Sequence, residues 1–147
     1  MKNGIRFFGH PLHALLIHFP MGLLPISLLW DLLAAWTGHT FWWELGFWSI
    51  LVGLSFAIIA VVPGFIDFVH IPEKHPAEKP ALIHMSIMLI AVGFFVCSLL
   101  FRIHDKILMG MKMYGALGCS LLGIVFLIAG GWYGGELVYR HQIGSKR

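Results

Sequence analysis

Four long stretches of this sequence contain no charged residue. They run from Pro11 to Trp30, from Leu45 to Ile66, from Ala81 to Phe101 and from Met113 to Gly135, with lengths of 20, 22, 21 and 23 residues. A helix rises about 1.5 Å per residue and the apolar core of a bilayer is about 30 Å thick, so each stretch can cross a membrane once. The chain is therefore predicted to be an all-α membrane protein with four transmembrane helices.

The composition agrees with one membrane domain that covers residues 1–147. Hydrophobic residues make up 59% of the chain and charged residues 12%, against roughly 25% charged residues in ordinary soluble domains. A soluble globule of this size has too small an interior to bury so much apolar surface. These proportions exclude a soluble enzyme, a nucleic-acid binder and a disordered tail. The net charge of +3 is then explained by orientation in the membrane.

The connections between the four stretches are short, which favours an up-down antiparallel bundle. Both termini and residues 67–80 then share one side, called the terminal side below. Its basic residues are Lys2, Arg6, Lys74, Lys79, Arg140, Lys146 and Arg147, whereas Arg102, Lys106 and Lys112 lie on the opposite side. Because basic residues accumulate in cytoplasmic segments, both termini are predicted to lie in the cytoplasm.

Small residues recur at helical spacing in the second and fourth stretches. The two stripes are Gly53, Ala57, Ala60 and Gly64, and Cys119, Gly123, Gly130 and Gly134. Such stripes allow helices to approach closely in lipid, and they would also accommodate a flat cofactor. Cys97 and Cys119 are interpreted as ordinary packing residues, because both lie inside apolar stretches.

Seven of the nine histidines fall on the terminal half of the predicted bundle: His10, His13, His18, His70, His75, His84 and His141. Two of them enter the spanning helices, with His18 about 10 Å beyond Pro11 and His84 about 5 Å beyond Ala81. Ionisable groups at such depth are costly and by default face the bundle interior. His18 and His84 are therefore expected to point inward at the same level and to meet.

Two inward imidazoles on different helices suit haem iron better than zinc or copper. Zinc and copper sites usually recruit a third or fourth ligand, and the cysteines lie toward the other end of their helices. Haem needs only axial ligands from the protein. We therefore expect haem b with His18 and His84 as iron ligands, Gly134 beside the macrocycle and Arg140 or Arg6 near its propionates. A hydrogen-bonded structural histidine, or one that handles protons, remains the alternative.

His13, His70 and His141 are the reserve ligands. His13 lies near the headgroups with His10, where surface exposure or capping is the simpler interpretation. His70 follows Asp67 by one helical turn, so the pair shares a face. The Asp67–His70 pair would orient a ligand histidine, form part of a quinone or proton site, or simply be exposed to solvent. No nucleophile triad, phosphate loop or nucleotide fingerprint is present in the sequence.

Several of these residues belong to ordered motifs. They are His10-Pro11-Leu12-His13, His18-Phe19-Pro20, Asp31-Leu32, Gly64-Phe65-Ile66-Asp67, His84 and the ending Gly134-Gly135-Glu136-Leu137-Val138-Tyr139-Arg140-His141. In order and spacing the chain resembles the bacterial membrane family called domain of unknown function 2231. It departs from the family pattern at Met88, where Asn is common, and at Gln142, where Gly is common.

The resemblance implies a four-helix protein of the bacterial inner membrane, from a family sometimes joined to Rieske-type iron–sulfur modules. Together with the histidines, it leads to the expectation of a small b-type cytochrome-like protein. Such a protein would exchange electrons with a quinone or a partner complex and would not be a stand-alone enzyme. The alternatives are a cofactor-free accessory subunit of a larger respiratory or transport complex, and a metal or proton permeation protein.

Overall fold

The computed structural model describes residues 5–103 and 110–143, and these form four long helices. The elements are β1 (Arg6–Phe7), β2 (His10–Pro11), α1 (Leu12–Leu16), α2 (His18–Thr37), α3 (Thr40–Val69), α4 (Glu78–Leu100) and α5 (Gly110–Tyr139). Together α1 and α2 make one membrane span, Leu12–Thr37, and α3, α4 and α5 make the other three. The four predicted transmembrane helices are confirmed.

Proline accounts for the break between α1 and α2. Pro20 has no N–H to donate to the carbonyl of Leu16, and its ring crowds that carbonyl. The helix is interrupted at Ile17, whose N–H bonds to the carbonyl of His13 at 3.1 Å. At the other end, α2 stops at Gly38, which adopts a left-handed φ of 70° and donates to the carbonyl of Ala34 at 2.8 Å. The chain then reverses directly into α3.

A short β-hairpin, with two residues in each strand, precedes the first helix. Arg6 pairs with Pro11 and Phe7 with His10 in the antiparallel strands β1 and β2. The turn between them has positive φ at Phe8 and Gly9, 46° and 81°, as a tight hairpin turn requires. This hairpin was not predicted from the sequence. It leads the chain into α1 at the terminal side.

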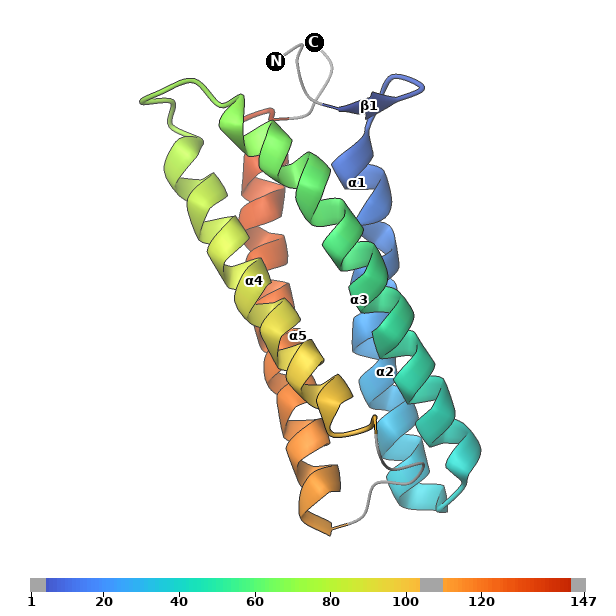
Figure 1. Cartoon of the computed structure of the whole chain (residues 1–147). Coiled ribbons are helices and arrows are strands. Elements are labelled where there is room, and N and C mark those ends of the chain that lie inside the picture. Colours follow the sequence, from blue (N-terminus) through green and yellow to red (C-terminus); the bar gives the residue numbers. More distant parts are fainter. Residues whose placement is uncertain (1–4, 104–109, 144–147) are drawn as a thin grey trace.

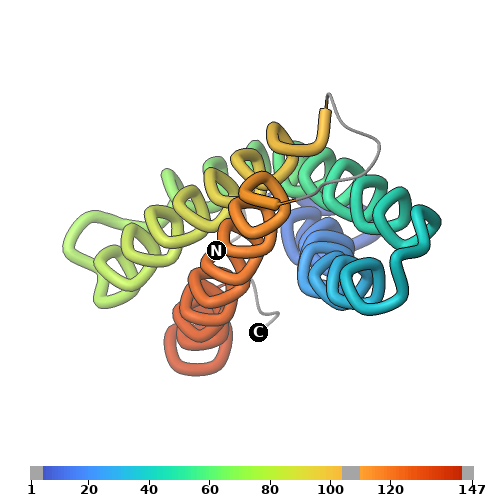
Figure 2. The backbone as a smooth tube through the Cα atoms, turned by 90° about the horizontal axis from the view of Figure 1, so that it is seen from below, coloured from blue at the N-terminus to red at the C-terminus, as the bar shows by residue number. Residues whose placement is uncertain are grey.

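The bundle consists of two antiparallel hairpins. The most extensive packing joins α2 to α3 and α4 to α5, and fewer contacts link the two pairs. Viewed along the bundle, α2 lies beside α3 and α5 lies beside α4 (Figure 2). The start of α1 and the end of α5 lie at the same end of the bundle (Figure 1), as an up-down topology requires. The predicted up-down arrangement is therefore confirmed.

The core lies in the middle of the bundle and draws on all four spans. It consists of Leu24, Ile50, Leu54, Ala91, Phe95 and Leu127. Large side chains pack directly against glycines here. A Cβ at Gly53 would lie 2.8 Å from Leu24 Cδ2, and one at Gly123 would lie 2.8 Å from Phe95 Cε2, so neither position has room for a larger residue. The small-residue stripes therefore include close helix contacts, as predicted from the sequence.

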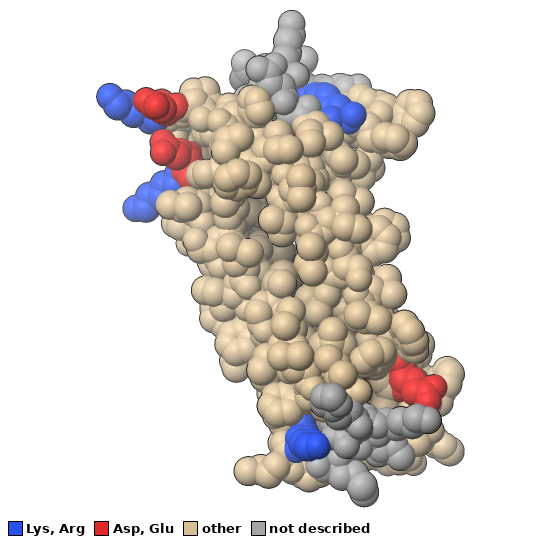
Figure 3. Space-filling view, viewed as in Figure 1, with Lys and Arg blue, Asp and Glu red and all other residues tan. Residues whose placement is uncertain are grey.

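The surface has the pattern of a membrane-spanning bundle. On the face shown in Figure 3, Lys, Arg, Asp and Glu appear at the two ends, and the band between them shows none of these charged residues. Large side chains such as Ile58, Val62 and Ile128 are exposed within this band. Such exposure is favourable only in an apolar solvent such as lipid. Four of the basic residues used to predict orientation, Lys2, Lys106, Lys146 and Arg147, lie outside the described residues.

Candidate functional site

His13 is fixed between the first two spans at the terminal side. The residue lies in α1 and is half-buried, and its Nδ1 is 2.9 Å from the carbonyl oxygen of Ala60 in α3. The ring lies against Gly64, where a Cβ would come within 2.7 Å of Nδ1. Glycine at this position allows the imidazole to reach the backbone of α3 without a collision.

His84 has the same arrangement in the other hairpin. It lies in α4 and is half-buried, and its Nδ1 is 2.7 Å from the carbonyl oxygen of Gly130 in α5. Its ring lies against Gly134, where a Cβ would be 3.0 Å from Cε1. Gly134 was expected to lie beside a haem macrocycle. In the structure, the imidazole of His84 fills the space beside this glycine.

These hydrogen bonds determine which ring nitrogen can act as a ligand. A carbonyl oxygen only accepts, so Nδ1 of His13 and of His84 must carry the proton. In the neutral ring, Nε2 then carries the lone pair. Metal-bound histidines commonly show this pattern, with one ring nitrogen on the metal and the other donating to a carbonyl. His13 also influences His84 electrostatically, although the two residues belong to different hairpins.

A carboxylate accompanies His13 at the terminal side. Asp67, half-buried in α3, interacts electrostatically with His13, His70 and Arg6. His70 follows one turn later at the end of α3, where it is exposed and its Nδ1 bonds to the carbonyl of Ile66 at 2.7 Å. Asp67 and His70 form no ion pair or hydrogen bond within the described residues, so their association is limited to an electrostatic influence. The hydrogen bond of His70 goes to its own helix.

His18 does not face the bundle interior, which corrects the expected inward orientation. Its side chain is exposed, and its Nδ1 lies 3.4 Å from the carbonyl oxygen of Leu15 in its own segment. Five residues separate it from His13, a rotation of about 140° around a helix. Because His13 faces α3, His18 is turned to the outer surface. Of the described histidines near the terminal side, His13 and His84 are the two whose rings bond to a neighbouring helix.

The remaining predicted residues lie at the terminal surface. Arg140 Nη1 donates to Glu136 Oε1 at 3.0 Å, a pair four residues apart on one helix. His141 Nε2 lies 4.0 Å from the same oxygen, and its ring centroid is 6.5 Å from that of His75. His10 is exposed in β2. Within residues 5–103 and 110–143, no three His, Cys, Asp or Glu side chains come close enough to hold a metal ion.

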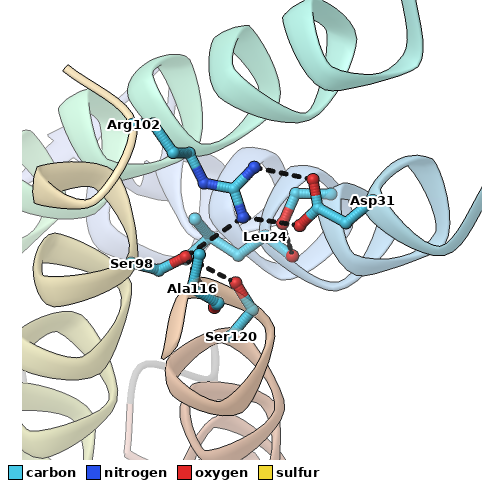
Figure 4. A network of polar contacts seen from close by, with 7 residues as sticks. Leu24, Asp31, Ser98, Arg102, Ala116 and Ser120 are labelled. Carbon is cyan, nitrogen blue, oxygen red and sulfur yellow. Dashed lines mark hydrogen bonds and ion pairs between the residues drawn. The ribbon is translucent and has the colours of Figure 1, made fainter. Parts of the chain in front are cut away.

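A second polar centre lies near the opposite end of the bundle. Asp31 of α2 and Arg102, just beyond α4, form a bidentate ion pair with both N–O distances at 2.6 Å (Figure 4). Arg102 Nη2 also donates to Ser98 Oγ at 3.2 Å, and Ser98 Oγ lies 2.8 Å from Ser120 Oγ. Asp31 is completely buried and Arg102 is 6% exposed. This network connects α2, α4 and α5.

This network was not predicted from the sequence, in which Asp31 stood out only as part of a motif and Arg102 only as a basic residue of the opposite side. The available signal was one acidic and one basic residue at the ends of apolar stretches, since buried charges in membranes are usually paired. A Cβ at Gly46 of α3 would collide with Asp31 Oδ1, so α3 also closes on this carboxylate.

Comparison with known proteins gives a family for the chain. A family model described as "Predicted membrane protein (DUF2231)" matches residues 9–147. The chain belongs to the DUF2231 family. No curated protein and no solved structure matches it. The family description covers residence in a membrane, in agreement with the four spans of this DUF2231 protein.

In this DUF2231 protein the sequence motifs gather at two places. Residues from the first, fourth, fifth and last motifs form the histidine site at the terminal side: His13, Gly64, Asp67, His84 and Gly134. Asp31 of the third motif forms the ion pair near the other end. The fold therefore separates the histidines, whose Nε2 atoms make no hydrogen bond within the described part of the chain, from a charge pair in which both carboxylate oxygens of Asp31 are bonded and Nε of Arg102 is not.

Proposed function

We propose that this DUF2231 protein binds haem b through His13 and His84 and exchanges electrons with a quinone or a partner complex. The observation that carries the proposal is the matched pair of Nδ1–carbonyl bonds, at 2.9 and 2.7 Å. Each bond leaves Nε2 as the coordinating atom and fixes the orientation of its ring. Haem would supply a one-electron redox centre at this position.

The origin of the two histidines supports a bridging ligand. His13 is tied to α3 within one hairpin, whereas His84 is tied to α5 within the other. The two hairpins contact each other less than the helices within each hairpin do. A prosthetic group held by both imidazoles would add a connection between the hairpins at the terminal side. Helical bundles commonly build cofactor sites from facing helices in this way.

The polar residues around the site also fit a haem near a membrane surface. Arg6 lies in β1 at the terminal side and is exposed, and it can pair with a propionate. Arg140 is already paired with Glu136, so Arg6 is the better of the two expected partners. Asp67 lies among His13, His70 and Arg6 and is placed to accept protons near the site.

An absorption spectrum of the purified full-length protein tests the proposal. With haem bound, we expect a Soret band and reduced α and β bands of a bis-histidine b-type centre, either as isolated or after addition of haem. His13→Ala and His84→Ala should each abolish or shift the reduced spectrum, because each removes one axial ligand. A protein without a Soret band that gains none with added haem would refute the proposal.

His18→Ala is the matched control. His18 lies five residues from His13 but is exposed on the outer surface. The variant should keep the wild-type spectrum and haem stoichiometry. If His18→Ala loses haem while His13→Ala keeps it, His13 is not a ligand. The iron ligands would then be His18 and His84, as expected from the sequence.

The second candidate function is a cofactor-free accessory subunit of a larger membrane complex. Its supporting observation is that both imidazoles already connect neighbouring helices through hydrogen bonds, which is a structural role in itself. Under this alternative the protein co-purifies as a colourless, stoichiometric component. His13→Ala would then lower stability without any spectral change.

A further inference from the structure

Two cysteines lie side by side on one flank of the α4–α5 pair. Cys97 of α4 is exposed, Cys119 of α5 is half-buried, and neither forms a disulfide. The two thiols influence each other electrostatically, so they lie close together. From the sequence they were interpreted as ordinary packing residues because both lie inside apolar stretches, and the 21 positions between them give no sign of contact. The antiparallel packing of α4 on α5 brings them together.

The register of the two helices explains this contact. Ser98 and Ser120 face each other in the interior, with their hydroxyl oxygens 2.8 Å apart. Each cysteine immediately precedes one of these serines. One step back along an α-helix turns a side chain by about 100°, and in antiparallel neighbours the two turns lead to the same flank. Cys97 and Cys119 therefore project together from one side of the pair.

Aromatic residues confirm that side chains cross between the helices on this flank. Phe94 lies one turn before Cys97, and Phe126 lies two turns after Cys119. Their rings stack with centroids 5.5 Å apart. On the other side of the cysteines, the ring of Phe101 lies against Gly115, where a Cβ would be 3.0 Å from Phe101 Cζ. The cysteine pair thus lies between two contacts that hold α4 against α5.

We propose that Cys97 and Cys119 form a reversible dithiol–disulfide pair that passes two electrons to a lipid-soluble quinone. The two S–H bonds break and one S–S bond forms, and the quinone takes up both electrons and both protons to become a quinol. Cys97 is exposed on the flank of a spanning helix, so its reaction partners come from the apolar part of the membrane. Quinones are two-electron oxidants that dissolve there.

The test uses the full-length protein in lipid nanodiscs, with its thiols first reduced and the reductant removed without oxygen. A fully substituted ubiquinone analogue is then added, since it cannot form adducts with thiols. We expect both thiols to be lost, the intact mass to fall by two hydrogen atoms and one quinol to form per chain. A thiol reductant should restore both thiols. Titration of thiols needs no haem, so this result is independent of the haem proposal.

Relocating one thiol provides the control. Cys119→Ser combined with Gly118→Cys keeps two thiols but turns one of them by about 100° to an exposed position with no neighbouring side chain within 4 Å. Its oxidation should be at least about tenfold slower, because a disulfide needs Cβ atoms within about 4.5 Å. Equal rates for the relocated and native pairs would overturn the proposal. So would thiols that stay reduced with quinone, or disulfides formed only between chains.

Discussion

The depth of a histidine in a membrane span does not decide whether its imidazole faces the bundle interior. His18 lies deeper along the chain than His13, yet it is exposed, whereas His13 is half-buried against Gly64. The difference arises from rotation around the helix and from the nearest glycine, which gives the ring room to reach a carbonyl. His84 and Gly134 repeat the combination in the second hairpin. A histidine on one helix with a glycine on its neighbour is therefore the informative pattern.

The glycine behind His13 can be tested by adding one methyl group. Gly64→Ala places a Cβ 2.7 Å from His13 Nδ1, so the ring must move and its bond to Ala60 is disturbed. Overpacking of this kind costs about 1–3 kcal/mol in the free energy of unfolding. Gly22→Ala, where nothing lies within 4 Å, is the control and should be neutral or slightly stabilising. Unfolding in mixed detergent measures both. Equal effects would show that His13 does not depend on the glycine.

The membrane-spanning helices and their antiparallel order were predicted correctly from the sequence. The side-chain contacts between these helices were not. Apart from Pro11 and Phe101 at their ends, the charge-free stretches lie within the four described spans, because lipid requires every backbone polar group to be paired internally. The interruption of the first span at Ile17 was not predicted, although Pro20 provides the cause. Nor was the approach of Cys97 to Cys119 or of Asp31 to Arg102. Such contacts depend on the rotation and register of neighbouring helices, which small residues along the interfaces decide.

The Asp31–Arg102 pair connects α2 with the end of α4, and a double-mutant cycle measures this connection. Asp31→Leu and Arg102→Met should each cost about 3–5 kcal/mol in unfolding free energy, because each leaves a buried charge without its partner. The double variant should be more stable than either single variant, since two apolar side chains replace both charges. Unfolding of all four proteins in the same detergent mixture gives the coupling energy. Additive effects would contradict a direct pairing.

At the scale of the whole molecule, the α2–α3 and α4–α5 pairs carry different polar groups at their two ends. Near one end, the paired charges of Asp31 and Arg102 leave neither carboxylate oxygen free of a hydrogen bond. At the terminal side, His13 and His84 belong to separate hairpins and each keeps one ring nitrogen for another partner. The first arrangement suits a permanent connection. The second suits a ligand that joins the hairpins, and this asymmetry favours the terminal side as the functional end.

Orientation in the membrane is also a property of the whole chain and remains a prediction. Seven basic residues on the terminal side against three on the other predict cytoplasmic termini. The burial of Arg102 in an ion pair strengthens this asymmetry, because one of those three charges is neutralised inside the bundle. Reporter fusions at both termini and in the loop after α3 should report the cytoplasm, whereas a fusion at His39 should report the other side. A periplasmic signal at either terminus would reverse the assignment.

The sequence by itself determined the membrane fold. Long stretches without charge can be stable only across a bilayer, and their number and short connections lead to a four-helix bundle. Only the tertiary structure decided which histidines reach a neighbouring helix, which charges pair and which thiols lie close together. Side-chain direction depends on helix rotation and register, and these follow from close packing between neighbours rather than from hydrophobicity along the chain. The positions of the His13 and His84 rings thus depend on Gly64 and Gly134, which leave room for them on the neighbouring helices.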